Sequence, residues 1–324
     1  MSDIGKKAPP DIPPPPDPER RREPLPESQP KAGAEDPHAP DRIQALLEAP
    51  SYRRADRDVA FLERDEARGL RLQLEYLKPE LLLCEHSVNN TIVVFGSTRI
   101  AEPSAAQRRI DMLERALAET PDDADLQRRL KVARHILDNS HYYSEAREFG
   151  RLVAEFGKGP LDCELVVMTG GGPGIMEATN RGAFEHGAKT VGMNIDLPEE
   201  QFPNPYISQE LCFRFRYFAL RKLHFMQRAR ALVAFPGGFG TMDELFEALT
   251  LIQTRTIKPL PVVLVGQAYW ERVIDFDFLL EQGAIDLEDR DIFWFAETAL
   301  EAWQGIEHWY IKCNRPMLSG ETEV

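Results

Sequence analysis

Short apolar runs alternate with amphipathic segments over most of the chain. Residues 91–95 are apolar and β-branched and lead into Gly96-Ser97, as a buried strand does where it meets a loop. The same pattern predicts four more strands, at residues 164–168, 189–195, 231–235 and 260–265. Helical periodicity predicts helices at 175–186, 216–230 and 241–254, with two or three more within 104–156. Strands that alternate with helices in this way predict an α/β fold with a doubly wound parallel sheet.

The chain before the first strand divides into two parts by composition. Leucines spaced among Arg and Glu predict a helix from residue 41 to about residue 83, within an N-terminal helical extension over 41–87. Residues 1–40 hold 12 of the 25 prolines and few large apolar side chains. Such a segment buries too little apolar surface to offset its ordering entropy, which predicts a disordered tail. A Pro-rich ligand for a partner protein is the alternative interpretation. We place the sheet domain at 88–310 and a C-terminal tail at 311–324.

Charge and cysteine usage exclude several function classes. The 39 Lys and Arg against 53 Asp and Glu leave a net charge of −14, which argues against binding to a nucleic acid backbone. No run approaches the roughly 18 apolar residues of a membrane span, and no signal peptide is evident, so we expect a cytoplasmic protein and no membrane partner. The four cysteines lie far apart, and we expect reduced, mostly buried thiols. The histidines lack zinc-ligand spacing, so no metal site is predicted.

A first glycine loop, Gly170-Gly-Gly-Pro-Gly174, follows the second predicted strand. Counting G-x-G-x-x-G from Gly172 puts Glu177 where the third glycine belongs, which disfavours a dinucleotide site. Without Cβ atoms, backbone N–H groups can approach a ligand closely before the chain enters a helix. A tight strand-to-helix turn without a ligand is the alternative.

A second glycine loop, Pro236-Gly-Gly-Phe-Gly-Thr241, also follows a predicted strand and opens a helix, which Thr241 is placed to cap. Free amides and the positive helix end favour an anion there, most simply a 5′-phosphate. A Walker A motif is absent because no lysine follows the glycines. Glu244 is either a capping-box residue for this helix or a carboxylate that acts in the crevice beside the phosphate. The residues alone leave both open.

Arg221 and Lys222 precede the fourth predicted strand in a segment rich in aromatic and basic residues. Most such cations belong to a solvated helix face. Arg221 could instead present its planar fork to phosphate or ribose oxygens.

Taken together, these motifs resemble the LOG family of phosphoribohydrolases, long labelled lysine decarboxylases. The most specific match is P-G-G-x-G-T-x-x-E from Pro236 to Glu244, with Arg221-Lys222 beginning fifteen residues ahead of the proline. Gly96-Ser97 and the segment from Gly170 to Met176 match as well. The resemblance spans about residues 88–300.

The resemblance implies a Rossmann-like fold and hydrolysis of the N-glycosidic bond of a nucleoside 5′-monophosphate, with no metal or organic cofactor. Arg221 and Glu244 match the two catalytic positions. The substrate-binding positions that it implies are Gly96, Ser97, Gly171, Gly172, Gly174, Met176, Lys222, Gly237, Gly238, Gly240 and Thr241. It also implies a homodimer or a higher homo-oligomer with the active site near the subunit interface.

Three features depart from the short plant-type members: the N-terminal extension, the long insertion before residue 164, and residues 194–206, which read NIDLPEEQFPNPY. The last of these resembles larger bacterial members that act on AMP, GMP and other monophosphates. We therefore expect an AMP- or GMP-type substrate, with cytokinin nucleotides as a further candidate. A nucleotide- or cofactor-binding module without catalysis is the alternative function, and a pyridoxal-phosphate decarboxylase lacks a convincing Schiff-base lysine.

Overall fold

The computed structural model describes residues 13–23, 25, 29–157, 164–198 and 202–318. The chain divides into two compact units, Met1–Arg68 and Gly69–Val324. The predicted disordered tail lies partly outside the described residues. The first unit holds α1 (Ala39–Glu48), α2 (Val59–Leu62) and three 3₁₀ turns, Pro50–Tyr52, Ala55–Arg57 and Asp65–Ala67.

The prediction of one continuous helix over residues 41–83 is therefore wrong, because several separate helical segments cover this range. Ala49 has extended backbone angles, φ −62° and ψ 135°, and Pro50 follows it. A residue before proline is disfavoured in the α region, so the first helix ends there. The helix α3 (Arg68–Glu85) forms the last part of the predicted range.

The second unit is built on a seven-stranded sheet with the order β4-β3-β2-β1-β5-β6-β7, and all six pairings are parallel. The strands are β1 (Thr91–Phe95), β2 (Val166–Thr169), β3 (Thr190–Ile195), β4 (Cys212–Phe215), β5 (Ala229–Ala234), β6 (Val262–Val265) and β7 (Phe293–Ala296). This confirms the predicted α/β, doubly wound parallel fold. The sequence pattern missed the two edge strands, β4 and β7.

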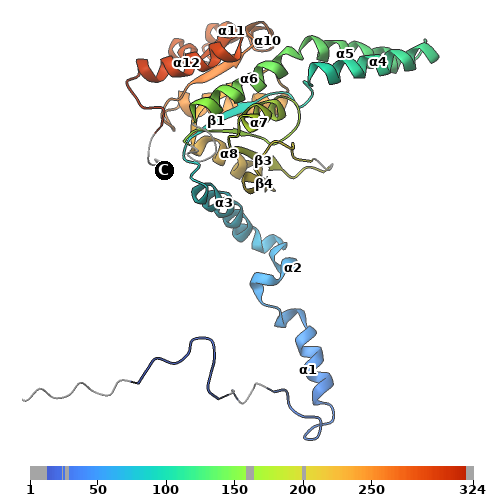
Figure 1. The fold of residues 1–324 in the computed structure, drawn as a ribbon, viewed down its shortest axis with the longest axis vertical. Coiled ribbons are helices and arrows are strands. Elements are labelled where there is room, and N and C mark those ends of the chain that lie inside the picture. The colour runs from blue at the N-terminus through green and yellow to red at the C-terminus, as the bar shows by residue number, and fades with distance from the viewer. Residues whose placement is uncertain (1–12, 24, 26–28, 158–163, 199–201, 319–324) are drawn as a thin grey trace, which may run out of the picture. The chain divides into compact units, whose positions relative to one another are not determined.

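Helices cover both faces of the sheet (Figure 1). They are α4 (Pro103–Glu119), α5 (Ala124–Asp138), α6 (His141–Phe156), α7 (Ile175–Glu185), α8 (Phe218–Gln227), α9 (Phe239–Gln253), α10 (Gln267–Val273), α11 (Phe276–Glu281) and α12 (Ala299–Lys312). Side chains alternate along β1, so that Ile92 and Val94 pack with α6, α7 and α12. Val93 and Phe95 pack on the opposite face, with α8 to α11 and with Leu83 of α3. Helix α3 is therefore part of the core of the second unit.

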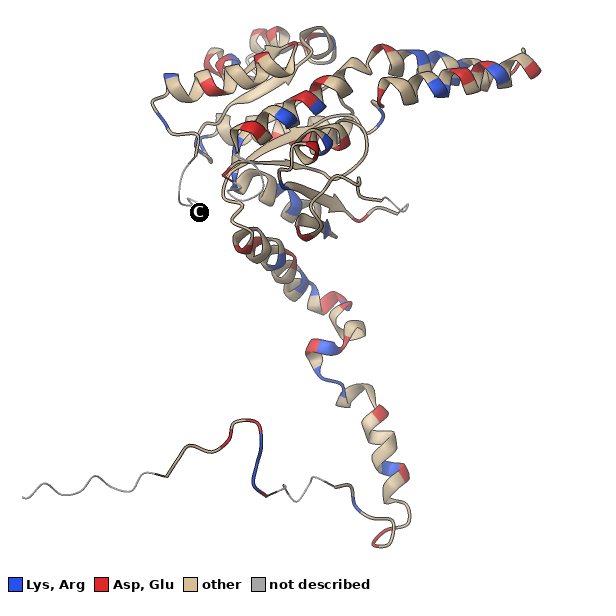
Figure 2. Ribbon diagram, viewed as in Figure 1, with Lys and Arg blue, Asp and Glu red and all other residues tan. Residues whose placement is uncertain are grey.

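Helices α4 and α5 pair through a small core of their own, formed by Ile110, Leu113, Leu130 and Ala133. Their outer surfaces carry Lys and Arg interspersed with Asp and Glu (Figure 2). Such mixed charges are typical of a solvated helix pair.

The direction of chain progression reverses at β1. Strands β2, β3 and β4 lie on one side of it, and β5, β6 and β7 on the other. Ligands of open parallel sheets bind at such a reversal, outside the carboxyl ends of the strands. Gly96 follows β1, the first glycine loop follows β2, and the second follows β5, so all three motifs meet at this edge.

Two expectations from composition have different outcomes. Among the described residues, no helix is long and apolar enough to cross a membrane. The expectation of mostly buried cysteines is wrong, because Cys84, Cys212 and Cys313 are exposed free thiols. Cys212 lies on the edge strand β4, which the sequence pattern did not reveal, and Cys163 falls outside the described residues.

Candidate active site

The second glycine loop enters α9 two residues earlier than expected. The helix begins at Phe239, its N-cap is Gly238, and no side chain caps it. The prediction that Thr241 caps the helix is therefore wrong, because Gly240 is accommodated in the first turn. Thr241 is buried against the loop, where a Cβ added to Gly237 would lie 2.1 Å from its Oγ1. The first amides of α9 have no capping side chain, which suits an anion.

Gly238 and Gly240 are exposed, and neither has a positive φ. A Cβ built on either residue would meet no heavy atom within 4 Å. Neither the backbone conformation nor the packing therefore requires glycine at these two positions. Gly238 is also the N-cap of α9, where glycine is favoured, and close approach of a ligand to the backbone is a further physical reason for glycine at both positions.

The first glycine loop requires glycine for its own folding. Gly171 has φ 72° and Gly174 has φ 76°, values that L side chains rarely adopt. A Cβ on Gly174 would also lie 2.3 Å from the Ser97 carbonyl oxygen. Half-buried Met176 lies over this loop, with its sulfur 2.9 Å from a Cβ placed on Gly170. The tight-turn interpretation accounts for these glycines, and their contact with substrate stays a prediction.

Ser97 joins the two glycine loops. Its backbone N–H donates to the Pro236 carbonyl oxygen over 3.0 Å, and its carbonyl oxygen accepts from the Ile175 N–H over 3.1 Å. Gly96 makes this close approach possible, because a Cβ there would lie 2.6 Å from the Ile175 side chain. The three strand ends therefore form one continuous rim.

Asn204 supports the first glycine loop from behind, a role that sequence reasoning did not assign. Its backbone N–H donates to the Gly171 carbonyl over 2.9 Å, and its Nδ2 donates to the Gly172 carbonyl over 3.1 Å. The same Nδ2 donates to Asn180 Oδ1 over 3.0 Å. The signal in the sequence is an asparagine between two prolines, at residues 203–205, and residues 199–201 just before it lie outside the described residues.

Arg221 and Glu244 form a buried ion pair. Arg221 on α8 donates from Nη2 to Glu244 Oε1 of α9 over 2.8 Å, and the two side chains are 12% and 5% exposed. Glu244 is thus engaged with Arg221, and the capping-box alternative is excluded because Thr241 is not the cap. The structure brings together the two residues that the sequence singles out as catalytic candidates.

The surroundings of this pair are mainly apolar. The Arg221 guanidinium lies 5.1 Å from the centre of the Phe218 ring and 5.4 Å from that of Phe225. Burial raises the pKa of Glu244 above its ordinary value, and the hydrogen bond and charge of Arg221 oppose that rise. Among the described residues, the buried Nε of Arg221 has no hydrogen-bond partner. A buried donor without a partner costs about 1–3 kcal/mol, and such groups concentrate at functional sites.

Lys222, the neighbour of Arg221, faces the outer side of α9. Its Nζ lies 2.8 Å from Asp243 Oδ1 and 3.3 Å from Glu247 Oε2. Burial lowers the pKa of Lys222, but the ion pairs with these carboxylates outweigh it, so the net shift is upward. The side chain therefore joins α8 to α9 in this structure, and its contact with substrate stays a prediction.

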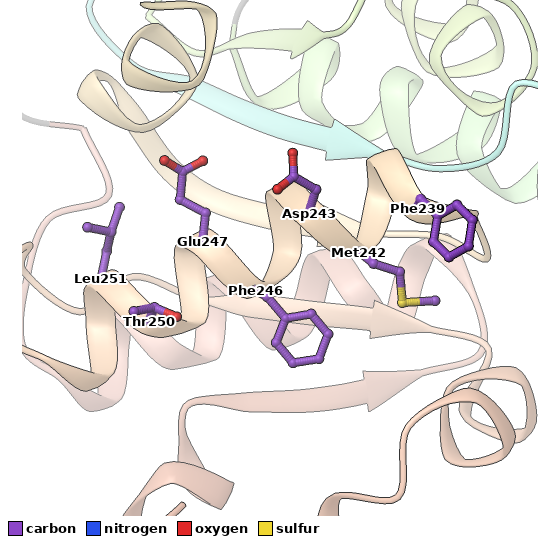
Figure 3. A pocket seen from close by; sticks show the side chains of 7 residues that line it. All are labelled: Phe239, Met242, Asp243, Phe246, Glu247, Thr250 and Leu251. Carbon is purple, nitrogen blue, oxygen red and sulfur yellow. The ribbon is translucent and has the colours of Figure 1, made fainter. Parts of the chain in front are cut away.

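An apolar surface adjoins the second glycine loop. Phe239 is 96% exposed at the start of α9, and Figure 3 shows Asp243 and Glu247 projecting from one side of this helix and Phe246 from another. A hollow of about 730 Å³ lies beside it, lined by Gly237, Gly238, Phe239, Met242, Phe246, Tyr269, Val273, Ile274, Asp275, Phe278 and Leu279. Among the described residues, no group of three His, Cys, Asp or Glu is placed to hold a metal ion.

Residues 176–306 match the family model described as "Possible lysine decarboxylase". A probable cytokinin riboside 5′-monophosphate phosphoribohydrolase of Oryza sativa subsp. japonica is 29% identical over 157 residues, which cover 47% of this chain and 67% of the relative. A cytokinin riboside 5′-monophosphate phosphoribohydrolase of Arabidopsis thaliana is 29% identical over 154 residues, which cover 46% and 69%. The resemblance to the LOG family is confirmed. The range that matches the family model includes the ion pair and the LOG-type second glycine loop.

Two solved structures align with part of this chain at low similarity. An X-ray structure from a structural genomics programme is 23% identical with a TM-score of 0.41, and the match covers 68% of this chain and 99% of that one. The molybdenum cofactor binding protein from the phototrophic bacterium Rippkaea orientalis is 20% identical with a TM-score of 0.36, covering 52% and 87%. Similarity at this level says nothing of function.

Proposed function

We propose that this LOG-type protein hydrolyses the N-glycosidic bond of nucleoside 5′-monophosphates, giving the free base and ribose 5-phosphate. The observation that carries the proposal is the buried ion pair between Arg221 of α8 and Glu244, which lies one turn inside α9, the helix that the second glycine loop opens. A carboxylate and a guanidinium are suited to a reaction that develops positive charge on a sugar while an anionic group is held nearby.

The phosphate binds at the N-terminus of α9. The open positions of Gly238 and Gly240 let phosphate oxygens approach the backbone, and the helix dipole favours a negative charge there. Neither position needs glycine for the fold itself, which supports this assignment.

Glu244 carries the chemical step. The C1′–N bond breaks with its electron pair on the base, and the oxocarbenium-like ribose is stabilised by the carboxylate. A water oxygen then bonds to C1′ and gives one proton to Glu244, which passes it on toward the departing base. Burial makes this carboxylate a stronger base than an exposed one because it raises the pKa.

Arg221 holds the phosphoribosyl part. Its Nη2 already bonds Glu244, and its Nε has no partner among the described residues. A phosphate or ribose oxygen would supply that partner when substrate binds. Ser97 and the first glycine loop would then shape the ribose and base side, and Lys222 would bind substrate from the face of α8 that pairs with α9.

We further propose a homodimer or a higher homo-oligomer that uses the apolar surface of α9, α10 and α11. Phe239, Phe246, Val273 and Phe278 are 96%, 38%, 45% and 53% exposed. Large exposed apolar side chains gathered in one place favour an interface. This surface borders Gly237 and Gly238, so the interface would lie beside the active site.

The deciding experiment incubates the purified protein with AMP, GMP, CMP and isopentenyladenosine monophosphate, and follows free base and ribose 5-phosphate by chromatography. We expect release from AMP or GMP, and the relative rates rank the bases. Release from the isopentenyl compound alone would instead assign a cytokinin-activating role. If no substrate is cleaved while calorimetry still detects AMP binding, the protein is a nucleotide-binding module and the proposed activity is wrong.

A further inference from the structure

We propose that Glu75 of α3 is a positioning residue for Arg221, because it anchors the backbone that enters the helix carrying Arg221. The inference rests on the proposed function. Glu75 also lies outside residues 176–306, the range that matches the family model.

Helix α8 begins without a cap of its own. Its N-cap residue is Tyr217, an aromatic residue, and no side chain within the segment accepts a hydrogen bond from the first turn. The Glu75 carboxylate of another helix instead binds the two residues that lead into α8. Its Oε1 accepts from the Arg216 N–H over 2.8 Å, and its Oε2 accepts from the Tyr217 N–H over 3.2 Å. A carboxylate on the backbone donors of a helix N-terminus satisfies them and complements the helix dipole.

The backbone that Glu75 anchors leads directly to Arg221. The Arg221 N–H donates to the Tyr217 carbonyl oxygen over 3.3 Å, so Arg221 lies one helical turn beyond the residue that Glu75 holds. Arg71, also on α3, donates from Nε to Tyr217 Oη over 3.2 Å. The backbone of Tyr217 is thus fixed from the α3 side, and the direction of the Arg221 side chain depends on it.

The far end of α8 is held by the same helix. Glu80 accepts two hydrogen bonds from the buried Arg228, the C-cap residue of α8, one of them over 2.8 Å from Nη1. Between the two ends, the Tyr76 ring stacks on His224 with ring centres 5.4 Å apart. Gln227 donates to Tyr76 Oη over 3.2 Å. Helix α3 therefore contacts α8 at both termini and at its middle.

This arrangement matters because a guanidinium that must serve both Glu244 and a phosphoribosyl group tolerates little displacement. A shift of about 1 Å at a catalytic group can lower a rate by about 100-fold. If the first turn of α8 loosens, Arg221 loses its direction even though its own side chain is unchanged.

The test compares Glu75→Ala and Glu75→Gln with Glu85→Ala in the full-length protein. Glu85 lies on the same helix, is exposed, and makes no side-chain hydrogen bond or ion pair with any other described residue. AMP hydrolysis gives kcat and KM, and thermal unfolding gives Tm. We expect Glu75→Ala to lower kcat/KM by about 10- to 100-fold. Glu75→Gln keeps one acceptor oxygen and should lose less, and Glu85→Ala should match the wild type.

A double-mutant cycle separates positioning from general stability. Arg221→Lys already lacks the planar fork, so Glu75→Ala should add little loss in that background if it acts through Arg221. The inference is overturned if the wild type is active and the kcat/KM of Glu75→Ala equals that of Glu85→Ala. It is also overturned if Glu75→Ala causes the same loss of kcat/KM in the wild-type and Arg221→Lys backgrounds. If the wild type cleaves no nucleotide, the proposed function fails separately. Calorimetric AMP binding then replaces turnover, and an affinity unchanged by Glu75→Ala overturns the positioning role.

Discussion

Arg221 Nη2 and Glu244 Oε1 lie 2.8 Å apart, although the residues are 23 positions apart on the two helices that flank β5 in the chain. Helix α8 leads into β5 and α9 leaves it, so one short strand fixes the spacing of the pair. Each side chain is the main charged partner of the other in an apolar setting. The pair therefore links α8 to α9 and is also the candidate catalytic centre.

Glu244→Gln should abolish turnover while AMP binding persists. The amide keeps an acceptor oxygen for Arg221 but cannot stabilise a cationic ribose or take a proton from water. We expect kcat to fall by at least about 100-fold, the usual contribution of a general base. Turnover by chromatography and affinity by calorimetry check the two halves of this expectation.

Arg221→Ala is the matched control for Glu244→Gln, and it should lose both turnover and AMP binding. Removing the guanidinium leaves Glu244 buried without its partner and removes the group that would hold the phosphoribosyl part. Unchanged turnover in Glu244→Gln would remove that residue from the mechanism.

The pH dependence of kcat/KM should shift in opposite directions when the charge of Lys222 or that of Glu247, both near Glu244, is removed. Burial raises the pKa of Glu244, Lys222 lowers it, and Glu247 raises it. Because the ionised carboxylate is the working form, the rate falls as pH drops through this pKa. Lys222→Met should therefore move the acid limb of kcat/KM to higher pH, and Glu247→Gln should move it to lower pH. Shifts of the same sign would show that Glu244 does not set this limb.

The sequence predicted the interior of the fold well and its margins poorly. Residues 91–95 form β1 as expected, because a β-branched apolar run buried on both faces is a strong signal. The edge strands β4 and β7 escaped notice, since neither is a β-branched apolar run: β4 mixes Cys and Arg with two aromatic residues, and β7 has three aromatic residues and an alanine. Propensity distinguishes such segments from loops only weakly.

For the candidate site, too, some predictions from the sequence were correct and others were wrong. The motif spacing located Arg221 and Glu244, but capping chemistry misplaced Thr241, because α9 begins two residues earlier, at Phe239, and includes Gly240 in its first turn. The role of Glu75 could not be read from the sequence at all. Its contact with Tyr217 spans 142 positions, and only tertiary packing brings the two helices together.

Gly240→Ala should give a protein that is more stable and less active. Alanine in a helix is about 0.5–1 kcal/mol better than glycine, and the added Cβ meets no protein atom within 4 Å. The same Cβ would obstruct a phosphate at the backbone, and each lost hydrogen bond to a charged group costs about tenfold in affinity. Unfolding in urea and KM for AMP measure the two effects.

Gly69→Ala is the matched control, because Gly69 lies in α3 with equally open space around its Cβ position. It should stabilise the protein without changing KM. If Gly240→Ala also leaves KM unchanged, the phosphate does not lie at the N-terminus of α9.

Phe278→Asp should dissociate the proposed oligomer. Phe278 is 53% exposed on the apolar surface of α9, α10 and α11, and a carboxylate buried there on association is strongly unfavourable. Ile311→Asp is the control, since Ile311 is 75% exposed on α12, away from the residues that line that surface. Sedimentation velocity should show a smaller species for Phe278→Asp alone. Equal sedimentation of both variants and the wild type would place any interface elsewhere.

Glu80→Gln should destabilise the protein in a pH-dependent way. Arg228 is fully buried, and Glu80 is its charged partner. Weakening such a pair costs about 2–3 kcal/mol of unfolding free energy. The hydrogen bond from Arg228 is the main reason that the pKa of Glu80 lies below its ordinary value of 4.5.

A carboxyl with a lowered pKa stabilises the fold fully above its unfolded pKa, and this contribution disappears as pH falls through the folded value. The wild type should therefore exceed Glu80→Gln in stability at pH 7, and the difference should close progressively below pH 4.5. Urea titrations across this range measure it, with Glu85→Gln on the same helix as the control. A difference that is constant with pH would mean that lost packing, rather than the ion pair with Arg228, accounts for the effect.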